Sequence, residues 1–279
     1  MDGAALDTLV NVSTLVFVVT SMVAMGLTLT LRQIGAALDG RFVVAALLVN
    51  FVAVPAAAYG IDLVLDLDPS LFIGLIVVAS AGGAPFLPKL VQAAKGDAAA
   101  SVGLMVLLMV ATVVVMPIAL PLLLEGVEIS AWDIASSLIF LMLLPLGVAL
   151  FVRARYADWA ERAAGGFGTV STVALAFLVG GGLIAGWTDV VALIGTRGIL
   201  AGLLLIAIAF GLGWLTAGEG KRSVLALGSG QRNLSAAFVV AVQNFGDDPD
   251  VLAFVMVVAL VGLVALMLTA GELGRRAEA

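Results

Sequence analysis

The sequence contains no cysteine and no histidine, and only 11% of its 279 residues are charged. Without these two residue types the chain has no disulfide, no thiolate or imidazole metal ligand, and no nucleophile activated by histidine. We therefore expect no catalytic site, no metal site, no cofactor and no enzyme activity. A net charge of −6 also argues against a nucleic-acid partner, because phosphate binding requires a basic surface.

Hydrophobic residues make up 63% of the chain, and the mean hydropathy is +1.23. Soluble domains are close to half apolar and a quarter charged, so a water-soluble fold is excluded. A helix of about 20 residues crosses the hydrocarbon core of a bilayer. The sequence predicts an all-α membrane protein embedded in the lipid bilayer, with about nine spans near 8–31, 41–61, 70–95, 98–124, 132–152, 164–187, 197–217, 221–245 and 250–271.

Basic residues gather on one side of these predicted spans. With the amino terminus outside, all but two of the 13 basic residues lie in cytoplasmic segments, as the positive-inside rule requires. The exceptions are Arg197, in an outer loop, and Arg232, inside the eighth span. The first apolar run is expected to be a retained span and not a signal peptide. We predict a multi-pass protein of the cell membrane with a cytoplasmic carboxy terminus and an oligomeric state that composition does not define.

Two of the spans carry residues that interrupt a helix. The third span contains two glycines and two prolines between residues 82 and 88, a combination that breaks helices. The eighth contains the polar run Gly228-Ser229-Gly230-Gln231-Arg232-Asn233, which a lipid-facing helix does not tolerate. Both breaks, near 82–88 and 228–233, need protein or water around them.

The breaks occupy matching places in two halves of the chain. Residues 1–125 form a first repeat of four spans, 126–163 contain a connecting fifth span, and 164–279 form a second repeat of four spans. Each interrupted helix is third in its repeat, and the odd connecting span makes the repeats inverted. Broken helices that cross in inverted repeats indicate a secondary transporter with its substrate site where they meet. The alternative is that glycine and proline merely kink these helices.

A broken helix exposes amides at one end and carbonyls at the other, which attract anions and cations respectively. Arg232 can act as a counter-charge for an anion or as a replacement for a bound cation; alternatively, it is a structural residue paired with Asn50 or with carbonyls of the third span. Hydroxyls at Ser80, Thr112 and Ser235 are expected to bond within their own helices. The candidate substrate-binding residues are Asn50, Gly83, Ser229, Gln231, Arg232 and Asn233.

The order of several short motifs resembles the bile acid:sodium symporter family. These motifs are Met25-Gly26-Leu27-Thr28-Leu29, Asn50-Phe51 with Pro55, Gly82-Gly83, Lys95-Gly96-Asp97 with Ser101, and Gly230 with Asn233. The resemblance implies a panel domain made of the first, fifth and sixth spans and a core domain made of the other six. It also implies movement of the core against the panel, and amphipathic organic anions such as bile acids, sulfated steroids, pantoate-like acids or 2-keto acids as substrates.

The chain departs from this family at the residues that the family uses to bind sodium. Leu87 and Pro88 align with a Ser-Asn pair, Met105 with a hydroxyl, Gly228 with a shared acidic residue and Arg232 with a glutamine. Only Ser101, Asn50 and Gly228 remain as candidate ion ligands, and no Asp or Glu falls in the interior of any predicted span, since Asp133 and Asp250 lie at the beginning of theirs. An arginine about 4 Å from a bound cation adds about 4 kcal/mol of repulsion at an effective dielectric constant near 20. We therefore expect sodium binding to be severely weakened.

These observations predict a secondary transporter of a small organic anion that works by alternating access, with degraded sodium sites and Arg232 as a fixed cation. The alternatives are a sodium-coupled organic-anion symporter with rearranged ligands and a membrane sensor on the same fold that does not transport. Auxin-efflux-like carriers, arsenite permeases and channels are further possibilities, although the absence of cysteine argues against an arsenite carrier that uses a thiolate.

Overall fold

The computed structural model describes residues 3–30, 39–124, 130–185 and 196–278, and within these ranges every regular element is a helix. The all-α prediction is confirmed. The elements are α1 (Gly3–Thr28), α3 (Gly40–Leu48), η1 (Val49–Ala53), α4 (Val54–Leu65), α5 (Pro69–Ser80), α6 (Leu87–Ala93), α7 (Ala98–Leu123), α8 (Ala131–Leu138), η2 (Ile139–Leu143), α9 (Leu144–Arg155), α10 (Ala157–Ala185), α12 (Gly198–Thr216), α13 (Arg222–Gly230), α14 (Leu234–Asn244) and α15 (Pro249–Glu278).

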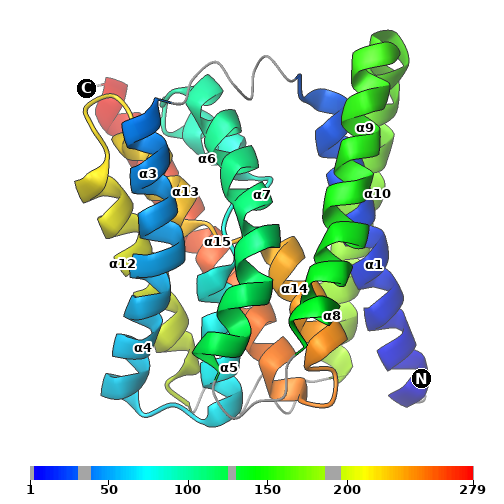
Figure 1. Cartoon of the computed structure of the whole chain (residues 1–279), viewed down its shortest axis with the longest axis vertical. Coiled ribbons are helices and arrows are strands. Elements are labelled where there is room, and N and C mark those ends of the chain that lie inside the picture. Colours follow the sequence, from blue (N-terminus) through cyan, green and yellow to red (C-terminus); the bar gives the residue numbers. More distant parts are fainter. Residues whose placement is uncertain (1–2, 31–38, 125–129, 186–195, 279) are drawn as a thin grey trace.

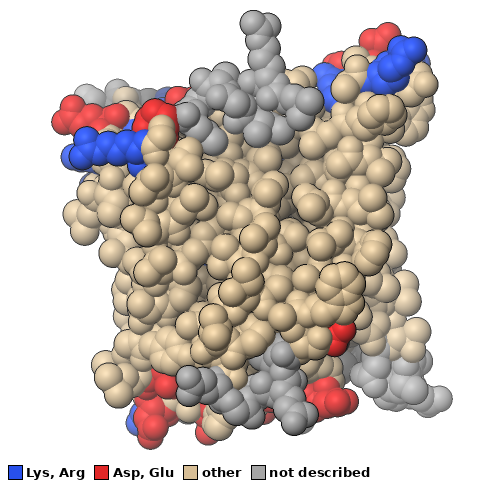
Figure 2. All heavy atoms as spheres, in the orientation of Figure 1, with Lys and Arg blue, Asp and Glu red and all other residues tan. Residues whose placement is uncertain are grey.

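Helix length and surface composition both fit a chain that crosses a membrane several times. Six of the described helices are long and apolar enough to span a bilayer. They are α1, the continuous α3–η1–α4 and α8–η2–α9 units, α7, α12 and α15. In the space-filling view a broad uncharged belt separates the charged side chains at the two ends of the molecule (Figure 2). The chain is therefore a multi-pass membrane protein.

The helices form two groups in space (Figure 1). One group contains α1, the continuous α8–η2–α9 unit and α10, with α1 packed mainly against α10 and α9. The second group contains α3, α4, α5, α6, α7, α12, α13, α14 and α15. The first group consists of the spans that the family resemblance assigns to the panel, and the second group consists of the spans that it assigns to the core. The two groups touch where α1 and α8 contact α14, for example through the edge-to-face rings of Phe17 and Phe238, whose centroids are 6.4 Å apart.

Polar side chains begin several of the helices. Asp39 accepts a hydrogen bond from the Phe42 amide at 2.8 Å, and Asp97 accepts one from the Ala100 amide at 3.0 Å. Such caps satisfy amides that the first turn of a helix leaves without a partner. Asp39 also pairs with Lys221 at 2.8 Å. The hydrogen bond from Lys221 is the main reason that the pKa of Asp39 lies below its usual value, and the Phe42 amide adds to the effect.

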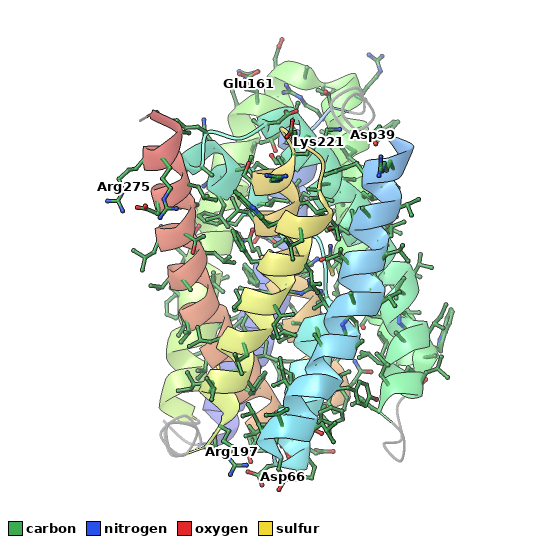
Figure 3. The ribbon with its side chains drawn as sticks, turned by 90° about the vertical axis from the view of Figure 1, so that its left-hand side faces the viewer. Asp39, Asp66, Glu161, Arg197, Lys221 and Arg275 are labelled. Atoms are coloured by element: carbon green, nitrogen blue, oxygen red, sulfur yellow. The ribbon has the colours of Figure 1, made fainter. Side chains whose placement is uncertain are left out.

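Charged residues mark two distinct ends of the molecule. Asp39, Glu161, Lys221 and Arg275 lie together at one end, and Asp66 and Arg197 lie at the opposite end (Figure 3). The beginning of α1 and the end of α15 also lie at opposite ends (Figure 1). This sorting matches the two sets of loops predicted from the sequence. Arg197 stands apart from the other labelled basic residues, as expected.

The predicted spans agree with the helices except at some of their limits. The first break runs from residue 81 to 86, not 82 to 88, because Pro88 lies in the first turn of α6, where its missing amide leaves no bond unmade. The second break covers only 231–233, not 228–233. Gly228 and Gly230 continue α13 because side chains from other helices pack directly against them. Two helices are longer than predicted: α10 begins at Ala157 where the predicted span begins at 164, and α15 extends to Glu278 where the predicted span ends at 271.

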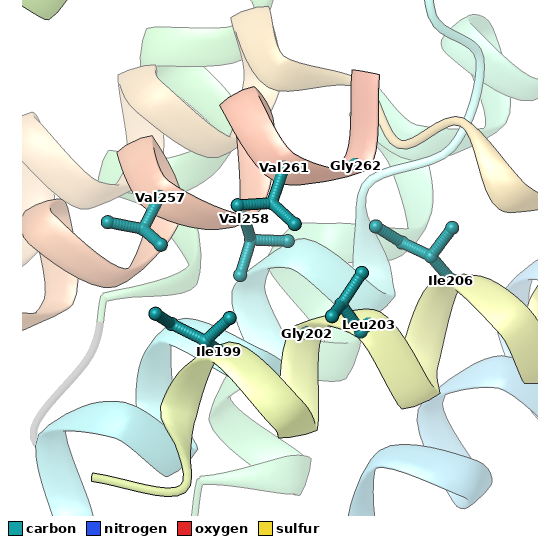
Figure 4. A pocket seen from close by; sticks show the side chains of 8 residues that line it. All are labelled: Ile199, Gly202, Leu203, Ile206, Val257, Val258, Val261 and Gly262. Carbon is teal, nitrogen blue, oxygen red and sulfur yellow. The ribbon is translucent and has the colours of Figure 1, made fainter. Parts of the chain in front are cut away.

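Helices α12 and α15 approach closely at two glycines (Figure 4). A Cβ atom on Gly202 would lie 2.4 Å from Cγ2 of Val258, and one on Gly262 would lie 2.4 Å from Cδ1 of Ile206. Both distances are shorter than van der Waals contact. Small residues at such points let membrane helices pack closely.

We predict that Gly202→Leu destabilises the protein by about 1–3 kcal/mol, the usual cost of inserting extra atoms into a packed interior. Gly211→Leu on the same helix is the matched control, because a Cβ atom there meets nothing within 4 Å. Thermal unfolding in detergent measures both variants. Equal stability of the two variants would show that α12 and α15 are not in close contact at Gly202.

Candidate functional site

The two helix breaks meet inside the core group. The Asn233 amide, in the second break, donates a hydrogen bond to the Ala81 carbonyl, in the first break, at 2.9 Å. Both residues are fully buried. This bond joins segments that are 152 positions apart in the chain, and the site is built around it.

The first break is held by the neighbouring helix α7. Thr112 Oγ1 accepts a hydrogen bond from the Gly82 amide at 2.8 Å and donates one to the Gly82 carbonyl at 2.9 Å. Gly83 has a φ of +79°, and a Cβ atom there would lie 2.2 Å from the Met109 backbone nitrogen. Only glycine satisfies both conditions. The predicted residue Gly83 therefore shapes the break by bringing its backbone against α7.

Arg232 lies at the centre of the crossing and is only 4% exposed. Its guanidinium donates to the carbonyls of Val78 at 3.1 Å and Ala79 at 2.6 Å, in the last turn of α5. It also donates to the Ser229 carbonyl of α13 at 2.9 Å and to Oδ1 of Asn50 at 2.8 Å. The side chain thus bridges the carbonyl ends of both first half-helices.

These contacts explain how a cation is accommodated here. Carbonyl ends of helices carry a partial negative charge, and two of them converge on Arg232. A guanidinium has five N–H donors, and the contacts above use four of them. The sequence analysis named Asn50 and carbonyls of the third span as partners for Arg232 if its role is structural. The structure shows hydrogen bonds to both, and one more to the Ser229 carbonyl. In this conformation the guanidinium of Arg232 forms its described hydrogen bonds with oxygen atoms of the protein.

Asn50 completes this cluster from the second span. It lies in the π-helical turn η1, four residues after Ala46, and is fully buried. Its Nδ2 donates to the Ala46 carbonyl at 2.9 Å and to Ser229 Oγ at 3.0 Å, while its Oδ1 accepts from Arg232. The structure therefore brings together three of the predicted site residues, Asn50, Ser229 and Arg232, in one hydrogen-bonded network.

The two remaining candidate ion ligands, Gly228 and Ser101, form no described hydrogen bond with Arg232 or Asn50. A Cβ atom on Gly228 would be 2.6 Å from Leu104 Cδ2 and 3.1 Å from Leu87 Cδ2, so two leucines pack against this position. Ser101 Oγ donates to the Ala98 carbonyl of its own helix at 2.6 Å. At Gly228, where the family resemblance places an acidic side chain, hydrocarbon fills the space.

Three buried polar atoms at the crossing have no hydrogen-bond partner. They are Ser80 Oγ at the end of α5, and Gln231 Oε1 and Asn233 Nδ2 in the second break. Leaving a buried polar atom unpaired costs roughly 1–3 kcal/mol. A cavity of ≈ 30 Å³ beside Gln231 and Leu234 has room for about one water molecule. Of the three residues, only Gln231 lines this cavity, so its Oε1 is the atom that a water molecule or a ligand there could pair with.

The sequence prediction was wrong for two of the buried hydroxyls, those of Thr112 and Ser80. It singled out Ser101 and expected Thr112 and Ser80 to bond within their own helices. In the structure Ser101 makes the local bond, Thr112 bonds across to the first break, and Ser80 makes none. No local signal distinguishes the three, because the partner of Thr112 is 30 residues away along the chain.

Comparison with known proteins gives one finding on the family. A model of the Sodium Bile acid symporter family matches residues 15–200. The match covers α1 to the beginning of α12, including the first break, and ends before the second break. No curated protein matches the chain.

The contacts of Arg232 predict its effect on stability. Arg232→Ala removes the charged donor from four buried acceptors, of which the Val78 carbonyl keeps the Ala81 amide. At roughly 1–3 kcal/mol for each of the other three, we expect the free energy of unfolding to fall by at least about 3 kcal/mol. Arg232→Lys keeps the charge but not the planar fork, so we expect a smaller loss. Thermal unfolding measures both effects, with the exposed Arg222→Ala as the control that removes a cation from α13.

Chemical rescue provides a second readout. Millimolar methylguanidinium should restore part of the lost stability of Arg232→Ala, and tetramethylammonium at equal ionic strength should not. A fully stable Arg232→Ala variant would contradict the bridging role.

Proposed function

The chain belongs to the sodium bile acid symporter family, and from this premise we propose that it is a secondary transporter that carries a small organic anion by alternating access without sodium. The observation that carries the proposal is the position of Arg232. Its guanidinium engages the carbonyl ends of α5 and α13, which would otherwise be available to a bound cation. A positive charge that belongs to the protein is present throughout the transport cycle and needs no ion gradient.

One further feature supports the absence of sodium coupling. Leu87 and Leu104 pack against Gly228, where the family resemblance implies an acidic residue. Sodium prefers several oxygen ligands, and replacing them by hydrocarbon removes the attraction while leaving the cost of dehydrating the ion.

The anion is proposed to bind at the beginning of α14. The Asn233 side chain accepts from the Ala236 amide at 3.1 Å and so caps this helix. The amides of Leu234 and Ser235 precede the first intrahelical hydrogen bond and are suited to an anion. Asn233 Nδ2 and Ser80 Oγ are buried without partners nearby in the crossing. These groups offer neutral hydrogen-bond donors to the anion. Arg232 attracts the anion through its positive charge, although its described hydrogen bonds go to protein oxygens.

Alternating access follows from the two groups of helices. The panel and the core meet through α1, α8 and α14, and movement of one against the other would expose the crossing to each side in turn. The order of the elements supports inverted repeats at 1–125 and 164–279, since α5/α6 and α13/α14 are each third among four spans. We propose the cell membrane as the location, with the end that carries Lys221 and Arg275 in the cytoplasm.

The transport prediction concerns sodium and Asn233. In proteoliposomes, uptake of at least one small organic carboxylate should be saturable and unchanged when sodium is replaced by N-methylglucamine at constant ionic strength. Asn233→Asp should weaken binding at least about tenfold, because it keeps the helix cap but loses two donors and adds a negative charge. Asn244→Asp, on the same helix, is the matched control.

The other outcomes identify the alternatives. Uptake driven by an inward sodium gradient would show a symporter with rearranged ligands. Ligand-dependent thermal stabilisation with no flux would show a sensor. If Asn233→Asp and Asn244→Asp behave alike in binding, the anion does not bind at the beginning of α14.

A further inference from the structure

An apolar groove of ≈ 470 Å³ lies between α12 and α15. Its volume is in the range of small-ligand sites. The two helices touch at Gly202 and Gly262 (Figure 4). The groove is lined by residues that follow this contact along both helices. The lining residues are Leu203, Leu204, Ile206, Ala207, Phe210, Ala265, Leu266 and Thr269.

The groove faces lipid and not the panel. Viewed from the side opposite the panel, α12 and α15 are adjacent and no panel helix lies in front of them (Figure 3). Thr269 is the one lining residue of the groove with a polar side chain, and its hydroxyl donates to the Ala265 carbonyl at 2.8 Å. In the membrane interior such a surface is filled by hydrocarbon.

The inner end of the groove is different. The ≈ 30 Å³ cavity beside Gln231 shares Ile206 and Leu266 with the groove, so these two side chains line both spaces. Gln231 is 7% exposed, and its Oε1 has no hydrogen-bond partner. A buried carbonyl oxygen requires a donor, and the neighbouring Arg232 directs its described bonds to other oxygens. An unpaired acceptor thus lies behind the wall that Ile206 and Leu266 form at the inner side of the groove.

We propose that this groove binds a single-chain lipid whose terminal O–H group donates a hydrogen bond to Gln231 Oε1. A long-chain alcohol has the required chemistry: an alkyl chain for the groove and one uncharged donor for the glutamine. A charged head group is disfavoured, because it would have to lose its hydration in a cavity that holds about one water molecule. The site is separate from the proposed anion site and does not depend on transport.

Trp214 provides a reporter for this site. Its ring stacks on Phe210, a groove residue, with centroids 6.0 Å apart. Replacing Trp132, Trp159 and Trp187 by phenylalanine leaves Trp214 as the single tryptophan. Bromine atoms on a bound chain quench nearby tryptophan fluorescence, so occupancy is read from Trp214 in lipid nanodiscs.

The probes are a chain-brominated long-chain alcohol and its methyl ether, which has the same chain and no donor. We expect saturable quenching by the alcohol and at least tenfold weaker binding of the ether. Gln231→Leu should remove this preference. Ala207→Phe should fill the groove and abolish saturable quenching, whereas Ala56→Phe, on an exposed face of α4, should leave it unchanged.

Three results would overturn the proposal. Quenching that rises linearly with probe content, and equally in Ala207→Phe, would indicate ordinary membrane lipid. Equal binding of alcohol and ether to the protein with native Gln231 would indicate that water alone satisfies this residue, and this comparison does not depend on the folding of any Gln231 variant. A preference for alcohol that persists in Gln231→Leu would place the acceptor elsewhere.

Discussion

The whole arrangement depends on satisfying the backbone where two helices stop inside a membrane. Lipid offers no hydrogen bonds, so carbonyls freed at the ends of α5 and α13 must find donors within the protein. Arg232 supplies them with three hydrogen bonds from one side chain, and Thr112 and the Asn233 amide complete the first break. A buried guanidinium is costly by itself, but here converging carbonyl dipoles surround it. The broken helices and the buried arginine therefore stabilise each other.

This dependence also explains why the space beside Gly228 is apolar. Once a permanent cation bridges the half-helices, a second cation nearby would be repelled. In the proposed mechanism a carboxylate at Gly228 would have no sodium ion to bind, and Leu87 and Leu104 fill that space. Family membership gives the architecture, and transport without sodium is our proposal for this chain. The proposed anion site and the proposed lipid site both use the polar atoms that the arginine network leaves unpaired, on Asn233 and Gln231.

The sequence predicted the spans and the existence of both breaks, because hydropathy, glycine and proline are local signals. It also offered Asn50 as a partner for Arg232, since few polar residues lie within the apolar spans. The limits of the breaks were not predictable. Gly228 and Gly230 remain helical because side chains such as Leu104 pack on them, and that packing is set by distant segments. Thr112 was missed for the same reason, and Ser101 was favoured because the family resemblance, not its surroundings, pointed to it.

The central claim is that Arg232 replaces a bound sodium ion at the crossing of the two broken helices. The most direct test is equilibrium binding of radiolabelled sodium to the purified protein in nanodiscs, at constant ionic strength with potassium as the balancing cation. The account predicts no saturable sodium binding that unlabelled sodium displaces and potassium does not. Stoichiometric, sodium-selective binding by the wild-type protein would contradict it.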